Sequence, residues 1–542
     1  MVVITTITLS VIYGIKVAAD RYREYRKSLA SPSGTSIRDL PPDVLQRIFV
    51  LVASPTSSSA SHYVPIGVPV PWLNLDLDLE LLFQLATVSK SWAQVAVPLL
   101  WSSPTISSSL MASELKTIVE SSLMGEIGVD AMFEYPEFIS AITIRNNALS
   151  EVDDVIDTST LASFLPLLPN LSRLQLDLPL VDYDSRDASD ILTCLLNPSL
   201  LNKLEHIKFP RVGVAQAATL DSAIGLLGEY GNLHHLTSLD LRGLDELDQS
   251  VRALLDLCGD TLKLLWLPSL SELSPILPWI RRHGSQLTYL AVGKWSAASP
   301  EEVAAFFQDL GQLSALEINS EILDVVVESV QSQCYALSSL KINGHINSLS
   351  FAHSEALQAL VQRIEHYDGP LGDFLEHGSS LKWLKLTDES NTHGRIRSLL
   401  GTLQSVQYFA ASYAAFDDLA EILYIIKTHA GLDICIIQGL DDERDAGTHQ
   451  NYWLGLDQLM GKGINSGSIS TAAVLECVDG DELWARAIRR VLASDSAIGI
   501  DLGYENFKAK LDHVSTGLLT FEEALSMDFD DCINGSDGET EA

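Results

Sequence analysis

Apolar positions along most of this 542-residue chain follow one short pattern. From about residue 135, an apolar residue is followed by a second three positions later and by a third two positions after that. Such alternation is typical of a short strand with one buried face. The pattern begins at Ile139, Leu171, Leu204, Leu236, Leu262, Leu287, Leu313, Leu337, Leu381, Val406 and Leu432.

Segments with helical spacing of apolar residues lie between these strands. We expect helices at 245–257, 300–309, 321–331, 355–367, 417–427 and 482–492. The run Ser299-Pro300-Glu301-Glu302 is typical of a helix start, because it offers a serine cap, a proline in the first helical position and a glutamate three residues after the cap. A strand and a helix repeated about every 25 residues cannot bury their apolar faces alone, so we expect an α/β solenoid with parallel strands inside and helices outside.

The number of residues between successive strand patterns is typical of a known class of repeat protein. Intervals between repeats run from 24 to 33 residues, with one of 44, and the body resembles leucine-rich repeats. It lacks the Asn or Cys that this family places three residues after the last apolar position, as Pro179, Leu244 and Glu321 show. The 44-residue interval indicates an insertion or a degenerate repeat, for which Ile346/Leu349/Phe351 is a candidate. We therefore expect irregular repeats.

A separate helical pattern precedes the solenoid. Proline suits the first turn of a helix and not its interior, so Pro41-Pro42 predicts a helix start, and Asp43 places a negative charge where the helix dipole favours it. Apolar residues then follow at helical spacing up to Val52, and further short apolar helical segments lie within 81–101.

The segments "LPPDVLQRIF" (40–49) and "VSKSWAQVAVPLLW" (88–101) resemble the two halves of an F-box, a module of three helices. The chain departs from the family pattern in having Asp43 for Glu, Ser89 for Cys, and a long Ser- and Pro-rich spacer at 54–78. The positions that match the family pattern are Leu40, Pro41, Leu45, Ile48, Phe49, Val88 and Trp92.

The resemblance implies partners. F-box modules bind the Skp adaptor of Skp-cullin-F-box ubiquitin ligases, so these seven residues would contact a Skp-type adaptor, which links them to a cullin scaffold. The same pattern would also fit an ordinary helical hairpin packed on the following domain. We expect four parts: an N-terminal segment at 1–35, an F-box at 36–101, an irregular leucine-rich-repeat solenoid at 102–515 and an acidic tail at 516–542.

Charge narrows the range of partners. The chain has 35 Lys and Arg against 71 Asp and Glu, a formal net charge of −36, and is repelled by phosphate backbones and anionic lipid surfaces. We expect neither a nucleic acid nor a membrane as partner. The six cysteines lie far apart without metal-binding spacing, which predicts reduced core thiols and a cytoplasmic or nuclear location.

The first residues carry a separate prediction. Residues 1–13 are uncharged and apolar, but the run is shorter than the ~20 residues of a membrane-spanning helix, and its basic residues follow it rather than precede it. We expect a disordered or loosely docked terminus. A membrane anchor and an incorrect start codon are the alternatives.

The solenoid predicts a binding surface. Strand residues that alternate with the core positions would face the concave side, because side chains alternate along a strand. Basic residues there (Arg145, Arg173, Lys208, Arg242, Lys341 and Lys385) outnumber acidic ones (Asp177, Asp240 and Glu317), and four aromatic residues (Trp266, Tyr289, Trp383 and Tyr408) would be at least partly exposed. We expect this face to bind an acidic or phosphorylated substrate segment. The alternative is that loops cover the aromatic residues.

No motif typical of catalysis occurs. The sequence lacks GxSxG, HExxH and GxxxxGK[ST], and no two of its 13 histidines have metal-binding spacing. We therefore predict no catalytic residue, no metal site and no cofactor. The predicted function is a non-enzymatic substrate-recognition subunit of a Skp-cullin-F-box ubiquitin ligase. The alternatives are a leucine-rich-repeat scaffold or recognition protein that works without ubiquitylation, and a hydrolase or transferase with a dispersed site.

Overall fold

The computed structural model contains two compact units, Met1–Pro55 with Ile66–Leu337 and Thr56–Pro65 with Ser338–Ala542. Residues 1–35, the spacer 54–78, nearly all of 417–427, the helix expected at 482–492 and the tail 516–542 lie outside the described residues. The described residues are 41–53, 79–123, 135–145, 156–180, 185–230, 233, 235–244, 247–259, 261–295, 299–344, 355–387, 395–412, 415, 425, 429, 434–438, 454–458 and 471–475.

Three helices open the first unit: α2 (Pro42–Ala53), α3 (Leu79–Ala86) and α4 (Lys90–Trp101). Helix α2 begins at Pro42 as predicted, and the Pro41 carbonyl accepts hydrogen bonds from the backbone N–H groups of Val44 and Leu45, both at 3.0 Å. Pro42 loses nothing at this position, since the first backbone N–H groups of a helix have no partner within it.

The three helices are joined to the solenoid by a very short connection. Strand β1 (Thr105–Ile106) begins four residues after Trp101 and pairs in parallel with β2 (Ala141–Arg145). Between them, the Ser102 carbonyl accepts hydrogen bonds from Ser140 N (3.0 Å), Ala141 N (3.0 Å) and Ser140 Oγ (3.2 Å). The sequence analysis did not predict β1, because a two-residue strand carries no periodic pattern.

Strands β1 to β8 of the first unit follow one another in sequence order, each parallel to the next. The buried positions Leu174, Leu239 and Leu290 lie in one row across the ladder and are at most 1% exposed. Burying each such side chain stabilises the fold by about 1.5–3 kcal/mol. The strands after β2 are β3 (Arg173–Asp177), β4 (His206–Lys208), β5 (Ser238–Asp240), β6 (Leu264–Trp266), β7 (Tyr289–Val292) and β8 (Ala315–Asn319).

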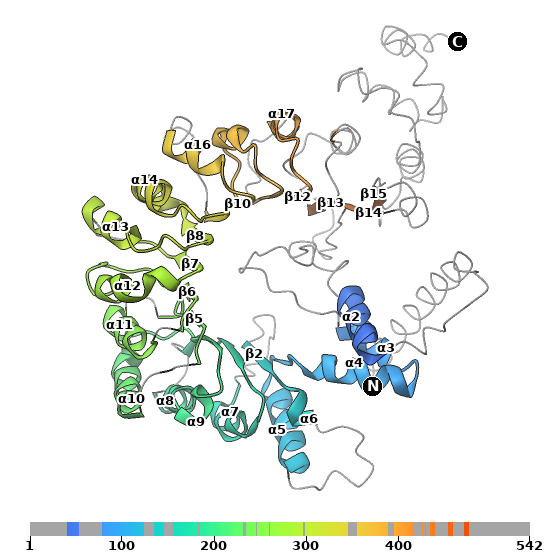
Figure 1. Ribbon diagram of the computed structural model, residues 1–542. Helices are drawn as coiled ribbons and strands as arrows, with labels where there is room; N and C mark the ends of the chain where they lie inside the picture. The colour runs from blue at the N-terminus through green and yellow to red at the C-terminus, as the bar shows by residue number, and fades with distance from the viewer. Residues whose placement is uncertain are drawn as a thin grey trace, which may run out of the picture. The chain divides into compact units, whose positions relative to one another are not determined.

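Helices of the first unit lie on one side of these strands (Figure 1). The capping box predicted at Ser299 is confirmed, since Ser299 Oγ accepts from Glu302 N at 3.2 Å and Ser299 N donates to Glu302 Oε2 at 3.0 Å. The helices are α5 (Ser109–Leu123), α6 (Tyr135–Phe138), α7 (Thr158–Phe164), η3 (Leu165–Leu167), α8 (Ser185–Leu195), α9 (Pro198–Leu201), η5 (Val214–Gln216), α10 (Ala217–Tyr230), α11 (Asp248–Leu257), α12 (Leu277–His283), η6 (Gly284–Gln286), α13 (Pro300–Phe307), η7 (Ser320–Ile322) and α14 (Leu323–Gln333).

The second unit continues the same architecture. Strands β9 to β13 are parallel neighbours in sequence order, and β14 pairs with β15 in an antiparallel hairpin. Its elements are β9 (Ser339–Asn343), α16 (Glu355–Val361), β10 (His366–Gly369), η8 (Asp373–His377), β11 (Trp383–Leu386), α17 (Arg395–Thr402), β12 (Tyr408–Ser412), β13 (Ile434–Gln438), β14 (Leu454–Gln458) and β15 (Thr471–Leu475). Both units confirm the predicted α/β solenoid of parallel strands.

One predicted helix was partly wrong. Helix α16 ends at Val361 rather than at residue 367, and β10 follows it, so the 44-residue interval contains an additional repeat. Its pattern, Ile364-x-x-Tyr367-x-Gly369, lacks the third apolar side chain. Tyr367 is fully buried, and its hydroxyl lies 2.9 Å from the position that a Cβ on Gly369 would occupy. The tyrosine therefore fills the space of the missing side chain. The candidate repeat at residues 346–351 lies outside the described residues.

Candidate functional site

The strand face turned away from the helices carries the side chains predicted to bind substrate. In the first unit we call it the ladder face. Its side chains form two rows in which each residue is the ladder neighbour of the next. The first row is Arg173, His206, Ser238, Leu264, Tyr289 and Ala315, and the second is Gln175, Lys208, Asp240, Trp266, Ala291 and Glu317.

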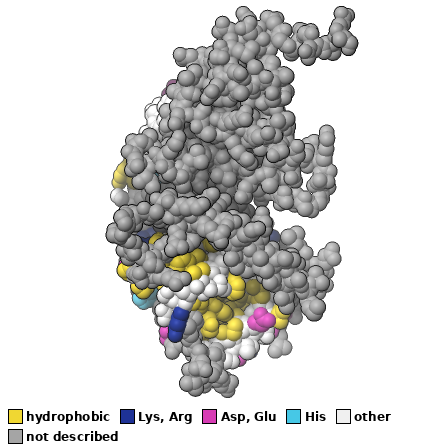
Figure 2. All heavy atoms as spheres, turned by 90° about the vertical axis from the view of Figure 1, so that its right-hand side faces the viewer, with side chains coloured by type: hydrophobic (Ala, Val, Ile, Leu, Met, Phe, Trp, Pro, Cys, Tyr) yellow, Lys and Arg dark blue, Asp and Glu magenta, His cyan; other side chains and the backbone are white. Residues whose placement is uncertain are grey.

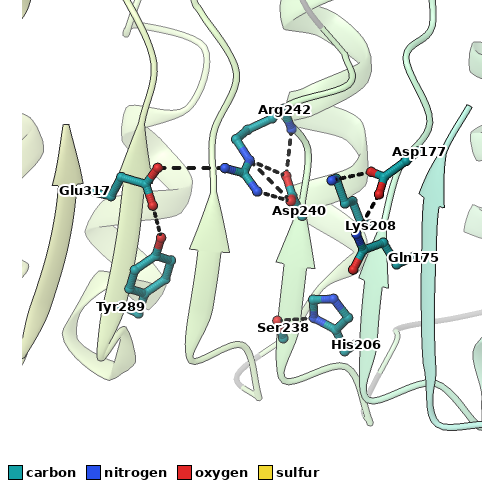
Figure 3. Close-up of polar contacts among 9 residues, drawn as sticks. All are labelled: Gln175, Asp177, His206, Lys208, Ser238, Asp240, Arg242, Tyr289 and Glu317. Atoms are coloured by element: carbon teal, nitrogen blue, oxygen red, sulfur yellow. Dashed lines mark hydrogen bonds and ion pairs between the residues drawn. The ribbon is translucent and has the colours of Figure 1, made fainter. Parts of the chain in front are cut away.

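Charged side chains on the ladder face pair with one another (Figure 3). Lys208 forms an ion pair with Asp177, whose Oδ2 also accepts a hydrogen bond from Gln175 Nε2 at 2.7 Å. Arg242 follows β5 and binds Asp240 in a bidentate manner, with Nε 3.0 Å from Oδ1 and Nη2 2.7 Å from Oδ2. These cations are already matched by carboxylates of the same face.

A buried carboxylate extends this network. Glu317 Oε1 lies 3.8 Å from Arg242 Nη1, and Glu317 Oε2 accepts a hydrogen bond from the Tyr289 hydroxyl at 2.7 Å. Burial disfavours the charged form of Arg242, but hydrogen bonds and Coulomb attraction to Asp240, and attraction to Glu317, outweigh it and raise the Arg242 pKa. Burial, and then the charge of Glu317, raise the pKa of Tyr289, so the phenol stays protonated as a donor. Asp240, Arg242, Glu317 and Tyr289 therefore form one connected network.

The aromatic side chains of the ladder face are buried. Trp266 is 7% exposed and Tyr289 is fully buried, and their ring centroids lie 4.5 Å apart. The Arg242 guanidinium sits over the Trp266 ring, 5.9 Å from its centroid, and His206 meets the same ring edge-on at 6.0 Å. Our expectation that these rings would be partly exposed was wrong, because stacking between neighbouring strands buries them.

The strand face of the second unit behaves in the same way. Trp383 and Tyr408 stack in parallel with centroids 5.0 Å apart, and both are buried, so their predicted exposure was also wrong. Lys385 lies 3.7 Å from the carboxylate of Asp368 on β10. Lys341 is only partly exposed. Asp368 was missed from the sequence because β10 itself was missed.

His206 is uncharged at neutral pH. Burial lowers its pKa to about 4, and the charges of Arg173 and Lys208 act in the same direction against the opposing charge of Asp240. Its Nδ1 shares a hydrogen bond with Ser238 Oγ. Of the ladder-face residues predicted to bind substrate, Arg173 and Arg242 are exposed, but Arg242 is paired with Asp240.

The three N-terminal helices enclose a small core of their own. Leu45 and Phe49 of α2 are 2% exposed and pack with Leu82 of α3 and Val95 and Ala96 of α4. Trp92, which is half-buried, meets the Phe49 ring edge-on with centroids 5.2 Å apart. The apolar stripe of α2 thus holds the three helices together.

Other apolar side chains of these helices point to solvent. Ile48 on α2 is 37% exposed, Phe83 on α3 is 54% exposed, and Val88 between α3 and α4 is 53% exposed. Leu79 lies one helical turn before Phe83 and is also exposed. Figure 2 shows hydrophobic side chains adjoining one another, with few charged ones among them, on the described part of the face that includes α2 to α6. We call Ile48, Leu79, Phe83 and Val88 the exposed apolar set.

Comparison with known proteins decides what these helices are. Residues 37–107 match the F-box-like family model. This chain contains an F-box-like domain. A search of curated proteins finds no match.

Two solved structures resemble the chain more distantly. The yeast complex of Rad7 and Elc1 contains a chain 12% identical to this one, with a TM-score of 0.37, covering 81% of this chain and 96% of that one. The complex of TLR13 with ssRNA13 shows 12% identity and a TM-score of 0.24, covering 52% of this chain and 37% of that one. The solenoid assignment rests on the parallel ladder of the chain itself.

The F-box geometry corrects part of the predicted adaptor surface. Leu45 and Phe49 belong to the core instead, because they are the residues of α2 that pack against α3 and α4. Pro41, Ile48 and Val88 are exposed, and Leu40 lies outside the described residues. Leu79 and Phe83 were not among the predicted adaptor residues, although their four-residue spacing within an apolar run was a usable signal.

Ser89, which stands where the family has Cys, has a structural role in the F-box. It is the N-cap of α4, and its Oγ accepts a hydrogen bond from Trp92 N at 3.2 Å. Serine is among the preferred N-cap residues, since its oxygen satisfies a backbone donor at the helix start. The departure from the family pattern is therefore compatible with the fold.

Three cysteines in the described part of the chain are buried thiols. Cys194, Cys258 and Cys334 are buried and form no disulfide, and burial raises the thiol pKa of Cys194 and Cys258 to about 12. Within the described ranges, no group of three or more His, Cys, Asp or Glu side chains could hold a metal ion. Nor is any helix in the described part of the chain long and apolar enough to cross a membrane.

Proposed function

We propose that this chain is a substrate-recognition subunit of a Skp-cullin-F-box ubiquitin ligase, working in the cytoplasm or nucleus. The F-box-like domain binds a Skp-type adaptor, which connects the chain to a cullin. The solenoid binds a protein substrate. Such a subunit supplies no catalytic side chain, because it accelerates transfer by raising the concentration of the substrate near the transferring enzyme.

The observation that supports adaptor binding is the exposed apolar set. Ile48, Phe83 and Val88 remain in solvent although the F-box core beside them is complete without them. Exposed apolar side chains of this kind are typical of protein interaction sites. The F-box resemblance implies a contact through Pro41, Ile48, Val88 and Trp92, and the exposure of Leu79 and Phe83 adds them to the candidates.

The proposed substrate-binding residues lie on the strand face of each unit. On the ladder face of the first unit, the residues selected from the sequence are Arg173, Lys208, Arg242, Trp266 and Tyr289. On the strand face of the second unit, they are Lys341, Trp383, Lys385 and Tyr408. An acidic or phosphorylated substrate segment fits the exposed cation Arg173 of the ladder face, which forms no ion pair with a described residue. Lys208 and Arg242 are instead held by carboxylates of the same face. The buried aromatic rings would support this surface from below rather than contact the substrate through their faces.

Affinity purification from cells tests the proposal. The full chain should recover a Skp-type adaptor and a cullin, and the double substitution Ile48→Asp with Phe83→Asp should abolish recovery of both, because it places two charges in an apolar contact. Val214→Asp is the matched control, since Val214 on η5 is also apolar and exposed. Recovery of neither adaptor nor cullin by the unsubstituted chain would contradict the proposal and favour a scaffold without ubiquitylation.

A further inference from the structure

The cations of the ladder face differ in whether they are already paired. Lys208 is held by Asp177, and Arg242 by Asp240 with Glu317 close by. An incoming anion at either site must compete with a carboxylate fixed in place. Because a charged group held in a short bidentate pair is among the strongest polar contacts in proteins, this competition is unfavourable.

Arg145 and Arg173 form the contrasting pair. Both side chains are exposed, and neither makes an ion pair with any residue that the structure describes. Over β2 to β4 the ladder face carries Arg145, Arg173 and Lys208 against Asp177, and His206 contributes no charge at neutral pH. Counted over the described residues of these three strands, this end of the face is therefore positive by two charges, within a chain whose net charge is −36.

The strand register fixes the spacing of the two arginines. Arg173 begins β3 opposite Ala141, whereas Arg145 ends β2 opposite Asp177, so the two lie four residues apart along neighbouring strands. At about 3.3 Å per residue this separation is about 13 Å along the strand direction. Between them lie Thr143 and Gln175, which are uncharged and half-buried. One small anion cannot bridge this distance between backbones, but an extended peptide can match it residue for residue.

We propose that Arg145 and Arg173 form a docking strip for an extended substrate segment that carries two anionic side chains about four residues apart. The inference rests on the proposed substrate-receptor function of the solenoid and places substrate capture at the strands nearest to the F-box. The anionic groups are carboxylates or phosphates, since guanidinium binds both with the same geometry. Lys208 and Arg242 shape the ladder face and do not anchor the anion.

Fluorescence anisotropy with the full chain bound to a Skp-type adaptor tests the strip. The probes are fluorescein-labelled Gly/Ser peptides of three kinds: two glutamates four residues apart, two phosphoserines four residues apart, and two glutamates adjacent to each other. We expect a peptide with the four-residue spacing to bind more tightly than the adjacent pair. Whether the carboxylate or the phosphate version binds more tightly identifies the source of the charge.

Substitutions locate the binding. Arg145→Gln and Arg173→Gln should each weaken binding by about tenfold, the typical loss of a hydrogen bond to a charged group. Arg281→Gln is the matched control, because Arg281 is an exposed arginine on α12, and it should leave binding unchanged. Lys208→Gln should change binding by less than about threefold, because Lys208 is already paired.

Three results would overturn the strip: no binding of any peptide, equal binding at both spacings, or binding that does not depend on Arg145 and Arg173. Tighter, arginine-dependent binding of single-stranded oligouridine would assign the strip to nucleic acid instead. Adaptor retention is measured in the same samples. Adaptor retention without peptide binding defeats the strip alone, whereas arginine-dependent peptide binding without adaptor capture defeats the ligase function alone.

Discussion

The F-box and the ladder face differ in which of their apolar and charged side chains are left exposed or unpaired. The F-box completes a small core with Leu45 and Phe49 and leaves Ile48 and Phe83 in solvent. The ladder face buries its aromatic rings and pairs most of its charges internally. Bulky apolar side chains are therefore exposed in the F-box, whereas the aromatic rings of the ladder face are buried.

The difference follows from the number of neighbours that each architecture provides. A side chain in a parallel sheet has a ladder neighbour on each side, about 4.8 Å away, so a long row of side chains stacks upon itself. Each helix of the F-box packs against the other two, and Ile48 and Phe83 still remain exposed. A cation on a strand face is available to bind an anion only if no carboxylate of the same face already pairs with it. Arg173 has no such pair with a described residue, whereas Arg242 is paired with Asp240.

Replacing Phe49 with Ala is the largest change expected from this comparison. It should destabilise the F-box by about 3–5 kcal/mol, the usual cost of truncating a buried Phe, and abolish adaptor capture. Ile48→Ala, on the exposed face of the same helix, should change stability by less than about 0.5 kcal/mol. Urea unfolding followed by fluorescence measures both. Equal costs would show that Ile48 and Phe49 do not differ in burial.

Lowering the pH should destabilise the ladder face through His206. Its pKa falls from an ordinary value of 6.5 to about 4 in the folded protein, so the unfolded chain binds more protons between these values. Stability is therefore complete above about pH 6.5 and declines as the pH falls towards 4, by up to about 3 kcal/mol at about 1.4 kcal/mol per unit.

Urea unfolding at several pH values measures this loss. His206→Gln is the comparison, because it removes the titrating ring while other groups still titrate. The difference in unfolding free energy between the two proteins should shrink as the pH falls from 6.5 to 4. A constant difference would mean that the imidazole is not held neutral by burial.

Replacing Tyr289 with Phe removes the hydroxyl donor to Glu317 and leaves a buried carboxylate less well satisfied. We expect a loss of about 2 kcal/mol in unfolding free energy, the order typical of a hydrogen bond to a charged group. Tyr335→Phe, at an exposed tyrosine of the same unit, serves as the control and should have almost no effect. If the two substitutions cost the same, the hydrogen-bonded network assigned to the ladder face would be wrong.

The smallest effect is expected at the F-box cap. Ser89→Ala removes the acceptor for the Trp92 backbone N–H and should cost about 1 kcal/mol. Ser89→Asp retains an acceptor and should preserve stability, which thermal unfolding can compare directly. A neutral Ser89→Ala substitution would show that the start of α4 does not depend on this bond.

Periodicity predicted the solenoid because its signal repeats. Strands β2 to β9 and β11 to β13 each begin two residues after the first apolar member of a pattern. Strand β10 was not predicted, because Gly369 stands where the pattern has an apolar side chain. Tyr367 fills that position as well as its own, so the packing stays intact. The six-residue pattern detects which side chains are apolar, whereas the packing of the core depends on the volume that the side chains fill.

The candidate sites were less predictable than the fold. Alternation along a strand correctly separates the ladder face from the core but does not reveal whether a cation meets a carboxylate on the next strand. Asp177 lies 31 residues before its partner Lys208 in the sequence, and that contact depends on register. Likewise, the helical stripe of α2 identifies Leu45 and Phe49 as apolar but not which partner they face.

The Ser102 carbonyl, which accepts three hydrogen bonds from residues 140 and 141, leaves almost no freedom between the F-box and the first coil of the solenoid. A conventional tether would allow a captured protein to sweep through many orientations and offer many of its lysines. Here the last F-box helix passes into the sheet within four residues, so a substrate held at β2 and β3 would present the same side each time. Which lysine is modified would then depend on its distance and direction from the transferring enzyme, and the hydrogen bonds to the Ser102 carbonyl would help to fix both.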